Sequence, residues 1–361
     1  MVIDVLVWAA IVVALFGIIC TLLPIIPTTL WWIRDMDFPR VQLTVLLACA
    51  IVPLLLFGRD ETWKIAVGVV AILCALYQVV KIFPYTSLHD TQSKMATRDD
   101  RDLHVRIMNS NVLMSNRNAA GLFHIIDDVD PDIFLALETD QWWTDEIKHE
   151  LAKSHPYQIA QPLDNTYGII LCSRYELIDP RVHYFVEDTI PSIITQVKLP
   201  SGDIVDLYCI HPRPPLPGED TEERDAELLV VAKMVKEMGR PAIVFGDLND
   251  VAWSHTTHLF QKISGMLDPR IGRGTYSTFH ADHFFLRYPL DHIFHTREFR
   301  LVMLQRLPAY GSDHFPITAE LSYEPEKKHH QEKPEAEPEE YEEAEEKIEE
   351  GVEEGRMEGE D

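Results

Sequence analysis

Gly246-Asp247-Leu248-Asn249 and Ser312-Asp313-His314 are the two runs that decide the fold of this chain. The first follows the apolar stretch Pro241–Phe245 and the second precedes the apolar stretch Phe315–Leu321, and both stretches predict buried strands. Each run therefore places oxygen-bearing side chains at the end of a strand. Oxygen ligands beside a titratable group are what Mg²⁺-assisted hydrolysis of a phosphate ester requires.

Strand-like segments outnumber helical ones between residues 103 and 323. Thr221–Met238 has apolar residues at helical spacing and an acidic first turn, so a helix is expected there. An excess of strands, joined by connections of varied length, predicts an α/β domain of mixed sheets with helices outside. The further predicted strands are Leu103–Met108, Asp132–Leu137, Tyr167–Cys172, Ile193–Leu199, Ile204–Ile210, Leu290–His295 and Leu301–Leu304.

The composition is strongly acidic, with a formal net charge of −26 over 361 residues. Residues 324–361 hold 18 acidic and 5 basic residues, and residues 103–323 hold 31 acidic and 19 basic residues. A protein that binds long nucleic acid usually neutralises phosphates with a basic face, so the acidic domain disfavours that ligand. The five cysteines lack zinc-like spacing and are expected to be buried free thiols, with a Cys172–Cys209 pair left open.

Three apolar segments precede the domain. Residues 5–33 and 41–58 contain no charged side chain, and Ile65–Val80 extends to Trp63 and Phe83 if the flanking lysines snorkel. About 20 apolar residues cross a bilayer as a helix, so three transmembrane helices are expected. The first segment lacks a basic start and two further spans follow, which favours an anchor over a cleaved signal peptide. No span carries an internal charge, which disfavours a transporter.

Composition predicts four regions along the chain. These are a membrane anchor at 1–85, a polar linker at 86–102, a catalytic domain at 103–323 and a Glu-rich tail at 324–361. The tail has too little apolar surface to offset the entropy of ordering, so it is expected to be disordered. The run from Glu339 to Glu354 is the part that could form a transient helix.

Two strand ends carry residues suited to catalysis. Asp247 and Asn249 lie two residues apart, so their side chains fall on the same side of an extended chain. There they can hold a metal-bound phosphate or an attacking water, although Asp and Asn also form Asx turns that need no ligand. His314 can act as a general base if a carboxylate orients its other ring nitrogen, and Asp291 is the candidate for that role.

Other strand ends carry further polar side chains. Glu138 directly follows a predicted strand and is either a metal ligand or a surface residue. Asn111 follows the first strand, and Asn109 has the same chemistry, so the choice between them stays open. His211 ends another strand and precedes a proline-rich loop, whose fixed backbone can hold His211 and Arg213 toward a phosphate.

Taken together and in this order, these residues resemble the endonuclease/exonuclease/phosphatase superfamily, which includes deoxyribonuclease I. The resemblance covers about residues 103–323. The matching segments are Ser110-Asn111-Val112, Pro131–Glu138, Tyr167–Leu171 with Ser173-Arg174, Ile210-His211-Pro212, Gly246–Asn249, Asp291–Phe294 and Ser312–Ile317.

The resemblance implies a two-sheet mixed β sandwich flanked by helices, with the site at one end. It also implies a Mg²⁺ or Mn²⁺ site. The implied metal ligands are Asn111, Glu138 and Asp313.

In the mechanism that the resemblance implies, water attacks phosphorus in line. Asp247 and Asn249 hold the nucleophilic water or the phosphate. His314 is the general base or a phosphate contact, and Asp291 orients it. His211 contacts the scissile phosphate and assists the leaving group.

Three spans ahead of such a domain, with His211-Pro212-Arg213-Pro214-Pro215 and residues 250–254, resemble a bacterial membrane branch of the superfamily. That resemblance implies an integral protein of the bacterial inner membrane with its catalytic domain facing the exterior or periplasm. The positive-inside rule gives the opposite result, because four basic residues follow the third span. The exterior is preferred because the resemblance is the more specific of the two.

The expected function is that of a membrane-anchored, divalent-metal-dependent phosphoesterase that hydrolyses a phosphodiester or pyrophosphate bond. The anchor and the acidic domain favour a lipid-linked or small phosphorylated substrate over nucleic acid. One alternative is a nuclease of the same fold acting on DNA or RNA, with a groove that includes Arg213, Trp253 and Arg273. Another is a non-catalytic membrane scaffold that retains the fold and would tolerate the loss of Glu138.

Overall fold

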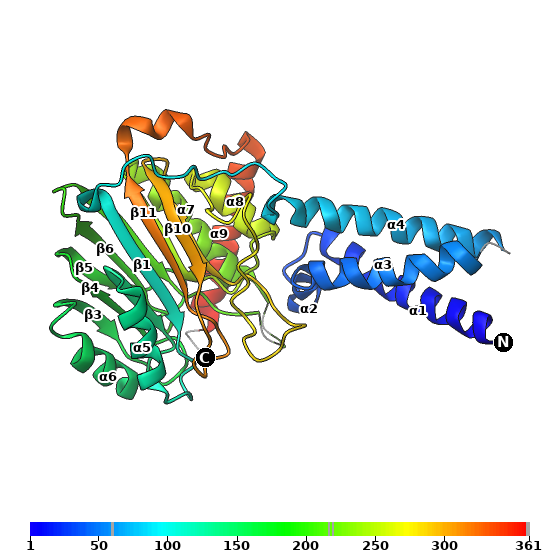
Figure 1. Cartoon of the computed structure of the whole chain (residues 1–361), viewed down its shortest axis with the longest axis horizontal. Helices are drawn as coiled ribbons and strands as arrows, with labels where there is room; N and C mark the ends of the chain where they lie inside the picture. The colour runs from blue at the N-terminus through cyan, green and yellow to red at the C-terminus, as the bar shows by residue number, and fades with distance from the viewer. Residues whose placement is uncertain (59–60, 216, 219, 359–361) are drawn as a thin grey trace. The chain divides into compact units, whose positions relative to one another are not determined.

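The computed structural model describes residues 1–58, 61–215, 217–218 and 220–358, and it divides the chain into two compact units (Figure 1). The helical unit contains Met1–His89 and Pro215–Thr221, and the sheet domain contains Asp90–Pro214 and Glu222–Asp361. The helical unit is therefore built from two stretches that lie far apart in the sequence.

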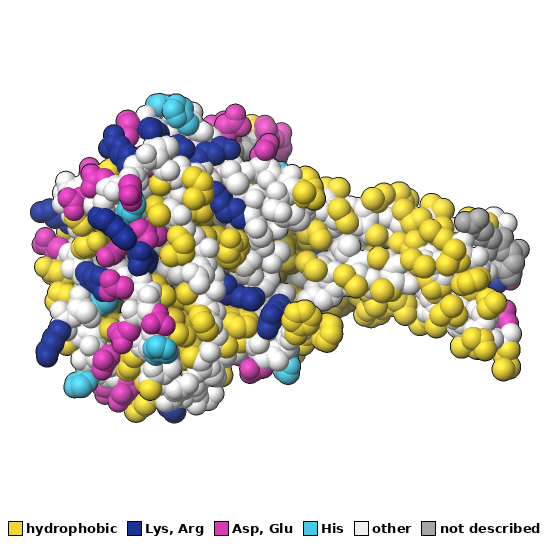
Figure 2. Space-filling model, viewed as in Figure 1, with side chains coloured by type: hydrophobic (Ala, Val, Ile, Leu, Met, Phe, Trp, Pro, Cys, Tyr) yellow, Lys and Arg dark blue, Asp and Glu magenta, His cyan; other side chains and the backbone are white. Residues whose placement is uncertain are grey.

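The helical unit contains the three predicted spans. Helices long and apolar enough to cross a membrane occupy Val2–Ile25, Arg40–Phe57 and Thr62–Tyr85. Figure 2 shows hydrophobic side chains along the surface of this unit, as helices that face lipid require. Its elements are α1 (Val2–Leu22), η1 (Leu23–Ile25), α2 (Trp31–Arg34), η2 (Asp35–Asp37), α3 (Arg40–Phe57), α4 (Thr62–Ile82) and η3 (Phe83–Tyr85).

A buried polar network joins the ends of these helices. Arg40 pairs with Asp37 and donates a hydrogen bond of 2.9 Å to Gln78 Oε1. Gln78 Nε2 in turn donates to Thr21 Oγ1 at 3.1 Å, and the Thr21 hydroxyl donates to the Gly17 carbonyl at 2.7 Å. The sequence did not reveal this network, because two of its members are uncharged residues within apolar runs.

The sheet domain is a sandwich of two mixed sheets. The strand order is β10-β11-β1-β2-β4-β3 in the first sheet and β5-β6-β7-β8-β9 in the second (Figure 1). Fully buried side chains such as Leu135, Ile193 and Phe245 fill the space between the sheets. The strands are β1 (His104–Asn111), β2 (Ile133–Leu137), β3 (Tyr157–Gln161), β4 (Ile169–Ser173), β5 (Leu177–His183), β6 (Ser192–Lys198), β7 (Ile204–Ile210), β8 (Ala242–Asp247), β9 (Asp291–His295), β10 (Phe299–Arg306) and β11 (Ile317–Tyr323).

Helices cover the outer faces of both sheets, which completes the predicted two-sheet α/β fold. The first sheet packs against α5 (Ala119–Val129) and α6 (Gln141–Leu151), and the second packs against α7 (Glu222–Met238) and α8 (His255–Ser264). Three of these helices begin at a side-chain cap, from Asn118, Asp140 and Ser254.

The topology brings the polar strand ends together. β1 runs parallel to β2, and β7 runs parallel to β8, so the carboxyl ends of each pair lie at one edge of their sheet. β11 and β9 run antiparallel to β1 and β8, so their starts lie at the same edges. In the second sheet, Asp247 at the end of β8 is the direct partner of Asp291 at the start of β9.

The Glu-rich tail is largely helical, so the prediction of disorder was wrong for most of residues 324–358. The chain forms η5 (Pro325–His330) and α9 (Pro338–Glu358). Ala344 of α9 is buried against the second sheet's helices, and a Cβ added at Gly351 would lie 2.5 Å from the Ala226 Cβ on α7. Small residues on one face of α9 therefore allow close packing that overall composition concealed.

The predicted linker is divided between the two units, since residues 86–89 belong to the helical unit. Residues 90–102 belong to the sheet domain, where Met95 forms a β-bridge with Leu301 of β10 and the Ala96 amide donates to the Leu301 carbonyl at 2.7 Å. The open question about cysteines is also answered, since Cys172 and Cys209 are both buried free thiols.

Candidate active site

β8 ends in a turn that requires glycine. Gly246 has a φ of 147°, and a Cβ there would lie 2.0 Å from the carbonyl oxygen of Ile210 on β7. The next residue, Asp247, accepts a hydrogen bond of 3.0 Å from the Asn249 amide through Oδ1, so the Asx-turn interpretation holds locally. Asn249 Nδ2 donates to the Pro212 carbonyl at 2.9 Å, which ties this turn to the loop after β7.

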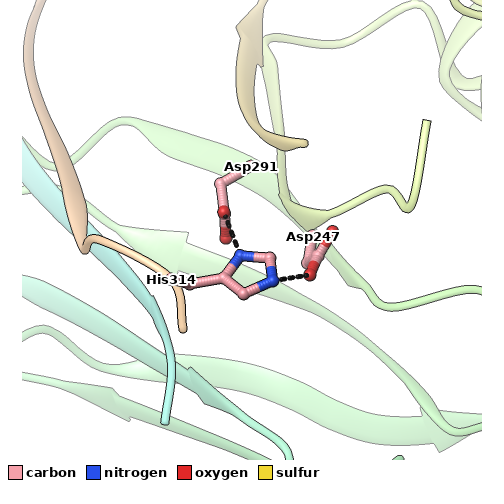
Figure 3. Close-up of side chains that lie close together, drawn as sticks. All are labelled: Asp247, Asp291 and His314. Atoms are coloured by element: carbon pink, nitrogen blue, oxygen red, sulfur yellow. Dashed lines mark hydrogen bonds and ion pairs between the residues drawn. The ribbon is translucent and has the colours of Figure 1, made fainter. Parts of the chain in front are cut away.

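His314 lies between two buried carboxylates (Figure 3). Its Nδ1 is 2.8 Å from Asp291 Oδ2, and its Nε2 is 3.5 Å from Asp247 Oδ2. The His314 amide also donates to the Ser312 hydroxyl at 3.1 Å, which fixes the loop before β11. The structure therefore forms the Asp291–His314 pair expected from the sequence and adds Asp247 on the other side of the ring.

Electrostatics favour the charged form of this imidazole. Burial alone would lower the pKa of His314, because an imidazolium loses hydration. The negative charges of Asp247 and Asp291 outweigh burial and raise the pKa of His314 to about 10. This arrangement favours the imidazolium, in which both ring nitrogens are donors.

Glu138 and Asn111 form a second polar pair beside Asp247. Asn111 Nδ2 donates to Glu138 Oε1 at 2.8 Å and to Asp247 Oδ2 at 3.3 Å. Glu138 is half-buried, has a φ of 60°, and accepts a hydrogen bond of 3.3 Å from the Met114 amide. An amide that bridges two carboxylates offsets part of their repulsion, and it links the two sheets at the site.

The two asparagines of β1 have different partners. Asn109 Nδ2 donates to Asp291 Oδ1 at 2.7 Å, whereas Asn111 contacts Glu138 and Asp247. Asn109 Oδ1 is buried without a hydrogen-bond partner in the described part of the chain. Asn109 therefore lies beside Asp291, and Asn111 lies between Glu138 and Asp247.

His211 is buried at the end of β7, with 3% of its surface exposed. Its ring lies 5.7 Å from the ring of Tyr167, and its Nδ1 has no hydrogen-bond partner among the residues that the structure describes. Burial lowers the pKa of His211, although the charges of Asp247 and Glu138 oppose the shift. A neutral imidazole with a free nitrogen is suited to a hydrogen bond with a bound ligand.

Asp313 is half-buried and lies on the same loop as His314. The Ser312 hydroxyl is 3.4 Å from Asp313 Oδ1 and donates to the Asn111 carbonyl at 2.8 Å. The loop that carries Asp313 is thus attached to the end of β1, which places all eight predicted site residues at one end of the sandwich.

Tyr310 belongs to this end of the sandwich and was not predicted. Its hydroxyl lies 2.8 Å from the Ser110 hydroxyl. Burial raises the pKa of Tyr310, and nearby carboxylates add to the rise, so the phenol stays protonated. Those carboxylates belong to Asp291, Asp313 and Glu138. A single Tyr in a loop carries no sequence pattern that could have marked it.

The donor atoms of the site fit a divalent cation. Asp247, Asp291 and His314 have ligand atoms within 4.8 Å of one another, close enough to share a metal ion. Both ring nitrogens of His314 already face carboxylates, so this cluster is also satisfied as an ion-paired network. Glu138 offers half-buried carboxylate oxygens, the ligands that Mg²⁺ and Mn²⁺ prefer, whereas Asn111 presents its amide nitrogen to Glu138 and its oxygen accepts from the Leu113 amide at 3.0 Å.

The residues considered for a nucleic-acid groove are buried or have partners within the protein. Trp253 is only 1% exposed. Arg213 pairs with Glu187, and Arg273 donates to the Pro269 carbonyl at 3.0 Å. The hypothesis that Arg213 faces a phosphate is therefore not supported in this conformation.

Known proteins share this fold. The family described as Endonuclease/Exonuclease/phosphatase matches residues 108–314. A humanized TDP2 of D. rerio aligns with a TM-score of 0.52 at 18% identity, over 61% of this chain and 99% of that chain. D. rerio TDP2 complexed with a single strand DNA product aligns with a TM-score of 0.51 at 19% identity, over 61% and 99%. The human Nocturnin catalytic domain with bound sulfate anion aligns with a TM-score of 0.51 at 17% identity, over 63% and 96%.

The comparison with curated proteins found no match. The family match nevertheless covers more than half of the chain, including the ends of β1, β2, β7 and β8 and the loop that carries His314. The chain therefore belongs to the Endonuclease/Exonuclease/phosphatase family, whose members are hydrolases that act on phosphate ester bonds.

Proposed function

We propose that the chain is a membrane-anchored, divalent-metal-dependent phosphoesterase that cleaves a phosphodiester or pyrophosphate bond in a lipid-linked or small phosphorylated substrate. The observation that carries this proposal is the buried contact of His314 with both Asp291 and Asp247, beside the Asn111–Glu138 pair. This constellation offers a positioned imidazole, carboxylates for a water molecule and oxygen ligands for a cation within one polar site.

The proposed roles follow from the contacts. Asp247 and Asn249 hold the attacking water or the phosphate, since both project from the turn after β8. Asp291 orients His314, which contacts the phosphate as an imidazolium or accepts the proton of the water as a neutral ring. His211, with its unpartnered Nδ1, donates or accepts a hydrogen bond at the scissile phosphate and assists the leaving group.

The proposed metal ligands are Glu138, Asn111 and Asp313. Glu138 is the central one, because it is half-buried and the amide of Asn111 holds one of its oxygens. A bound Mg²⁺ or Mn²⁺ supplies positive charge that stabilises the phosphoryl oxygens as charge develops on them.

The preference for a lipid-linked or small substrate rests on two features. Three candidate spans keep the domain beside a bilayer, and residues 103–323 carry 31 acidic against 19 basic residues. We further propose that the protein resides in a bacterial inner membrane with its sheet domain outside. Protease accessibility in intact spheroplasts tests the orientation, and protection of the domain would place it in the cytoplasm.

The central experiment measures hydrolysis by the full chain in detergent with Mg²⁺, Mn²⁺ or EDTA. The substrate panel contains bis-p-nitrophenyl phosphate, an isoprenyl diphosphate, a phospholipid and plasmid DNA. We expect metal-dependent turnover that is lost in Glu138→Ala and His314→Ala and retained in Glu146→Ala, an exposed carboxylate on α6. Turnover that survives both site substitutions would overturn the assignment of the site.

A nuclease of the same fold is the second candidate. It is favoured by the likeness to D. rerio TDP2, which was solved with a single strand DNA product. The acidic sheet domain and the partners of Arg213 and Arg273 disfavour it. Faster cleavage of DNA or RNA than of every lipid phosphate in the panel would establish the nuclease. A non-catalytic scaffold would show no turnover and no consequence of losing Glu138.

A further inference from the structure

The loop between Phe279 and Tyr288 exposes apolar side chains. Phe284, Phe285 and Leu286 are 69%, 78% and 49% exposed. In the described part of the sheet domain they are the one run of three consecutive large apolar residues with such exposure. An apolar tip of this kind is costly in water and marks a contact surface.

The loop is attached directly to the candidate active site. Phe279, at its start, forms β-bridges with His314 and Tyr288, and its ring lies 4.9 Å from the ring of His314. The Ala281 amide donates to the Asp313 carbonyl at 2.6 Å. Whatever covers the apolar tip is therefore held at the rim of the site.

Two guanidinium groups flank the base of the loop. The guanidinium carbons of Arg287 and Arg306 lie 5.0 Å and 4.4 Å from the ring centroid of Phe315. Their polar contacts are with the carbonyls of Ala281 and Ser277, and no carboxylate lies within 4.0 Å of either group among the described residues. Arg287 Nε is buried and has no hydrogen-bond partner within the described ranges of the chain.

These two half-buried cations therefore carry charge that the described protein groups do not neutralise. Burial lowers the pKa of Arg306, and the nearby charge of Arg287 adds to this. The loop itself contains one acidic residue, Asp282, which is exposed. Paired arginines beside an aromatic tip are typical of segments that contact anionic lipid.

We propose that the segment 280–287 inserts its tip, Phe284 to Leu286, into the bilayer surface, and that Arg287 and Arg306 bind phosphates of anionic phospholipids. Three helices are long and apolar enough to cross a membrane, so a lipid surface is the partner that a membrane-anchored chain would meet. Insertion would place the rim of the site at the level of the lipid headgroups, which deepens the proposed function. Only the identity of the substrate rests on that proposed function.

Insertion can be measured without turnover, so its failure is distinguishable from failure of the phosphoesterase assignment. The full chain carries Cys49→Ser, to remove the exposed native thiol, and Phe285→Cys labelled with an environment-sensitive fluorophore. It is reconstituted in nanodiscs that contain phosphatidylglycerol and phosphatidylcholine with spin-labelled quencher lipids. The matched control is Ile204→Cys, at a 47% exposed position at the start of β7.

We expect blue-shifted emission and strong lipid quenching for the label at Phe285 and neither for the label at Ile204. The double substitution Arg287→Gln and Arg306→Gln should reduce insertion about tenfold in anionic discs, because each arginine near an anionic surface contributes favourable binding. If a water-soluble quencher reduces the emission of the label at Phe285 and the spin-labelled lipids do not, the proposal is overturned. A blue shift at Phe285 without quenching by the spin-labelled lipids would also overturn it, and would indicate a protein partner or a second copy.

Discussion

Asp291 accepts hydrogen bonds through both of its oxygens, from Asn109 Nδ2 at 2.7 Å and from His314 Nδ1 at 2.8 Å. A carboxylate held in this way can take only one orientation, so the ring of His314 is fixed with Nε2 toward Asp247. An amide in place of this carboxylate would present a donor to Nδ1 in one of its two orientations. Loss of the carboxylate charge would favour a neutral ring, and that amide orientation would favour the tautomer with its proton on Nε2.

Asp291→Asn is therefore expected to lower kcat by about 10²- to 10⁴-fold with a smaller change in KM, because the imidazole loses its orientation and not its contact with substrate. Steady-state kinetics of the full chain on the best substrate of the panel measure this. Asp145→Asn, at an exposed position on α6, serves as the control. Equal kcat in the Asp291→Asn variant and the wild type would show that Asp291 does not position the ring.

Gly246 gives a prediction about stability. Gly246→Ala should destabilise the domain by about 3 kcal/mol or more, since the new Cβ would lie 2.0 Å from a backbone oxygen at a φ of 147°. Gly202→Ala is the matched control, because Gly202 also has a positive φ, of 90°, with nothing within 4 Å of the new Cβ. Thermal unfolding should show a much larger loss of Tm for Gly246→Ala, and equal losses would contradict the steric argument.

Among the structural elements, α9 is joined to its neighbours both by ion pairs and by the packing of small residues. Lys233 of α7 lies 2.5 Å from Glu345, and Lys347 of α9 lies 3.3 Å from Asp225 of α7. His255 of α8 also pairs with Glu343 of α9. Exposed ion pairs contribute little each, so packing of small residues on α7 is the larger stabilising factor.

Gly351→Leu is expected to detach α9 or to destabilise the domain by about 1–3 kcal/mol, because a Cβ there would lie 2.4 Å from the Glu222 carbonyl. The control is Glu346→Leu, which adds the same side chain at an exposed position of the same helix. Limited proteolysis and Tm both report the difference. Equal behaviour of the two variants would mean that α9 does not pack on α7 in solution.

Glu227 on α7 makes the free energy of unfolding depend on pH. Burial raises the pKa of Glu227 to about 7, and the Ser192 hydroxyl donates to it at 2.7 Å. Its ordinary value is 4.5, so the folded chain binds more protons than the unfolded chain between these pH values. The free energy of unfolding should therefore fall as pH rises from 4.5 to 7 and then level off.

Glu227→Gln should remove this component, so its Tm should depend less on pH over that window than the Tm of the wild type. Glu237→Gln, at an exposed position of the same helix, should leave the dependence intact. Unfolding scans from pH 4.5 to 8 measure both. A wild-type Tm that rises across the window would give the opposite sign and contradict the raised pKa.

The sequence predicted buried strands better than half-buried or exposed ones. β2, β4 and β8 are buried along their whole length and appear as apolar runs. β3 and β5 lie at sheet edges with mostly exposed or half-buried side chains, so they have no such pattern. α9 was predicted only as a transient helix over Glu339–Glu354, because its contacts with α7 leave no local pattern in the sequence.

The positions of candidate site residues were predictable where a polar residue lies at the end of a buried strand, as for Glu138, Asp247 and His211. The distinct partners of Asn109 and Asn111 were not, because both lie on β1 and only the fold determines which carboxylate each one meets. Tyr310 was hidden for a related reason, since its neighbours come from distant parts of the chain.

For the molecule as a whole, metal binding should raise the stability of the folded chain, measured as Tm. Mn²⁺ or Mg²⁺ well above its dissociation constant should raise Tm, because a ligand that binds only the folded chain stabilises it, and EDTA should reverse the shift. Glu138→Gln should abolish the shift, and Glu146→Gln should not. A shift that survives Glu138→Gln but is lost in Asp247→Asn would assign the ion to the cluster of Asp247, Asp291 and His314.

The pairing of Met95 with Leu301 has a consequence for how this chain avoids aggregation. β10 is the outermost strand of the first sheet, and an uncovered edge strand offers its backbone to other chains. The segment that follows the third span covers part of that edge, with the Arg300 side chain donating to the Met95 carbonyl at 2.8 Å. A soluble fragment cut at residue 103 would expose the edge and self-associate through it, whereas one that begins at residue 90 would keep its own cover and remain monomeric.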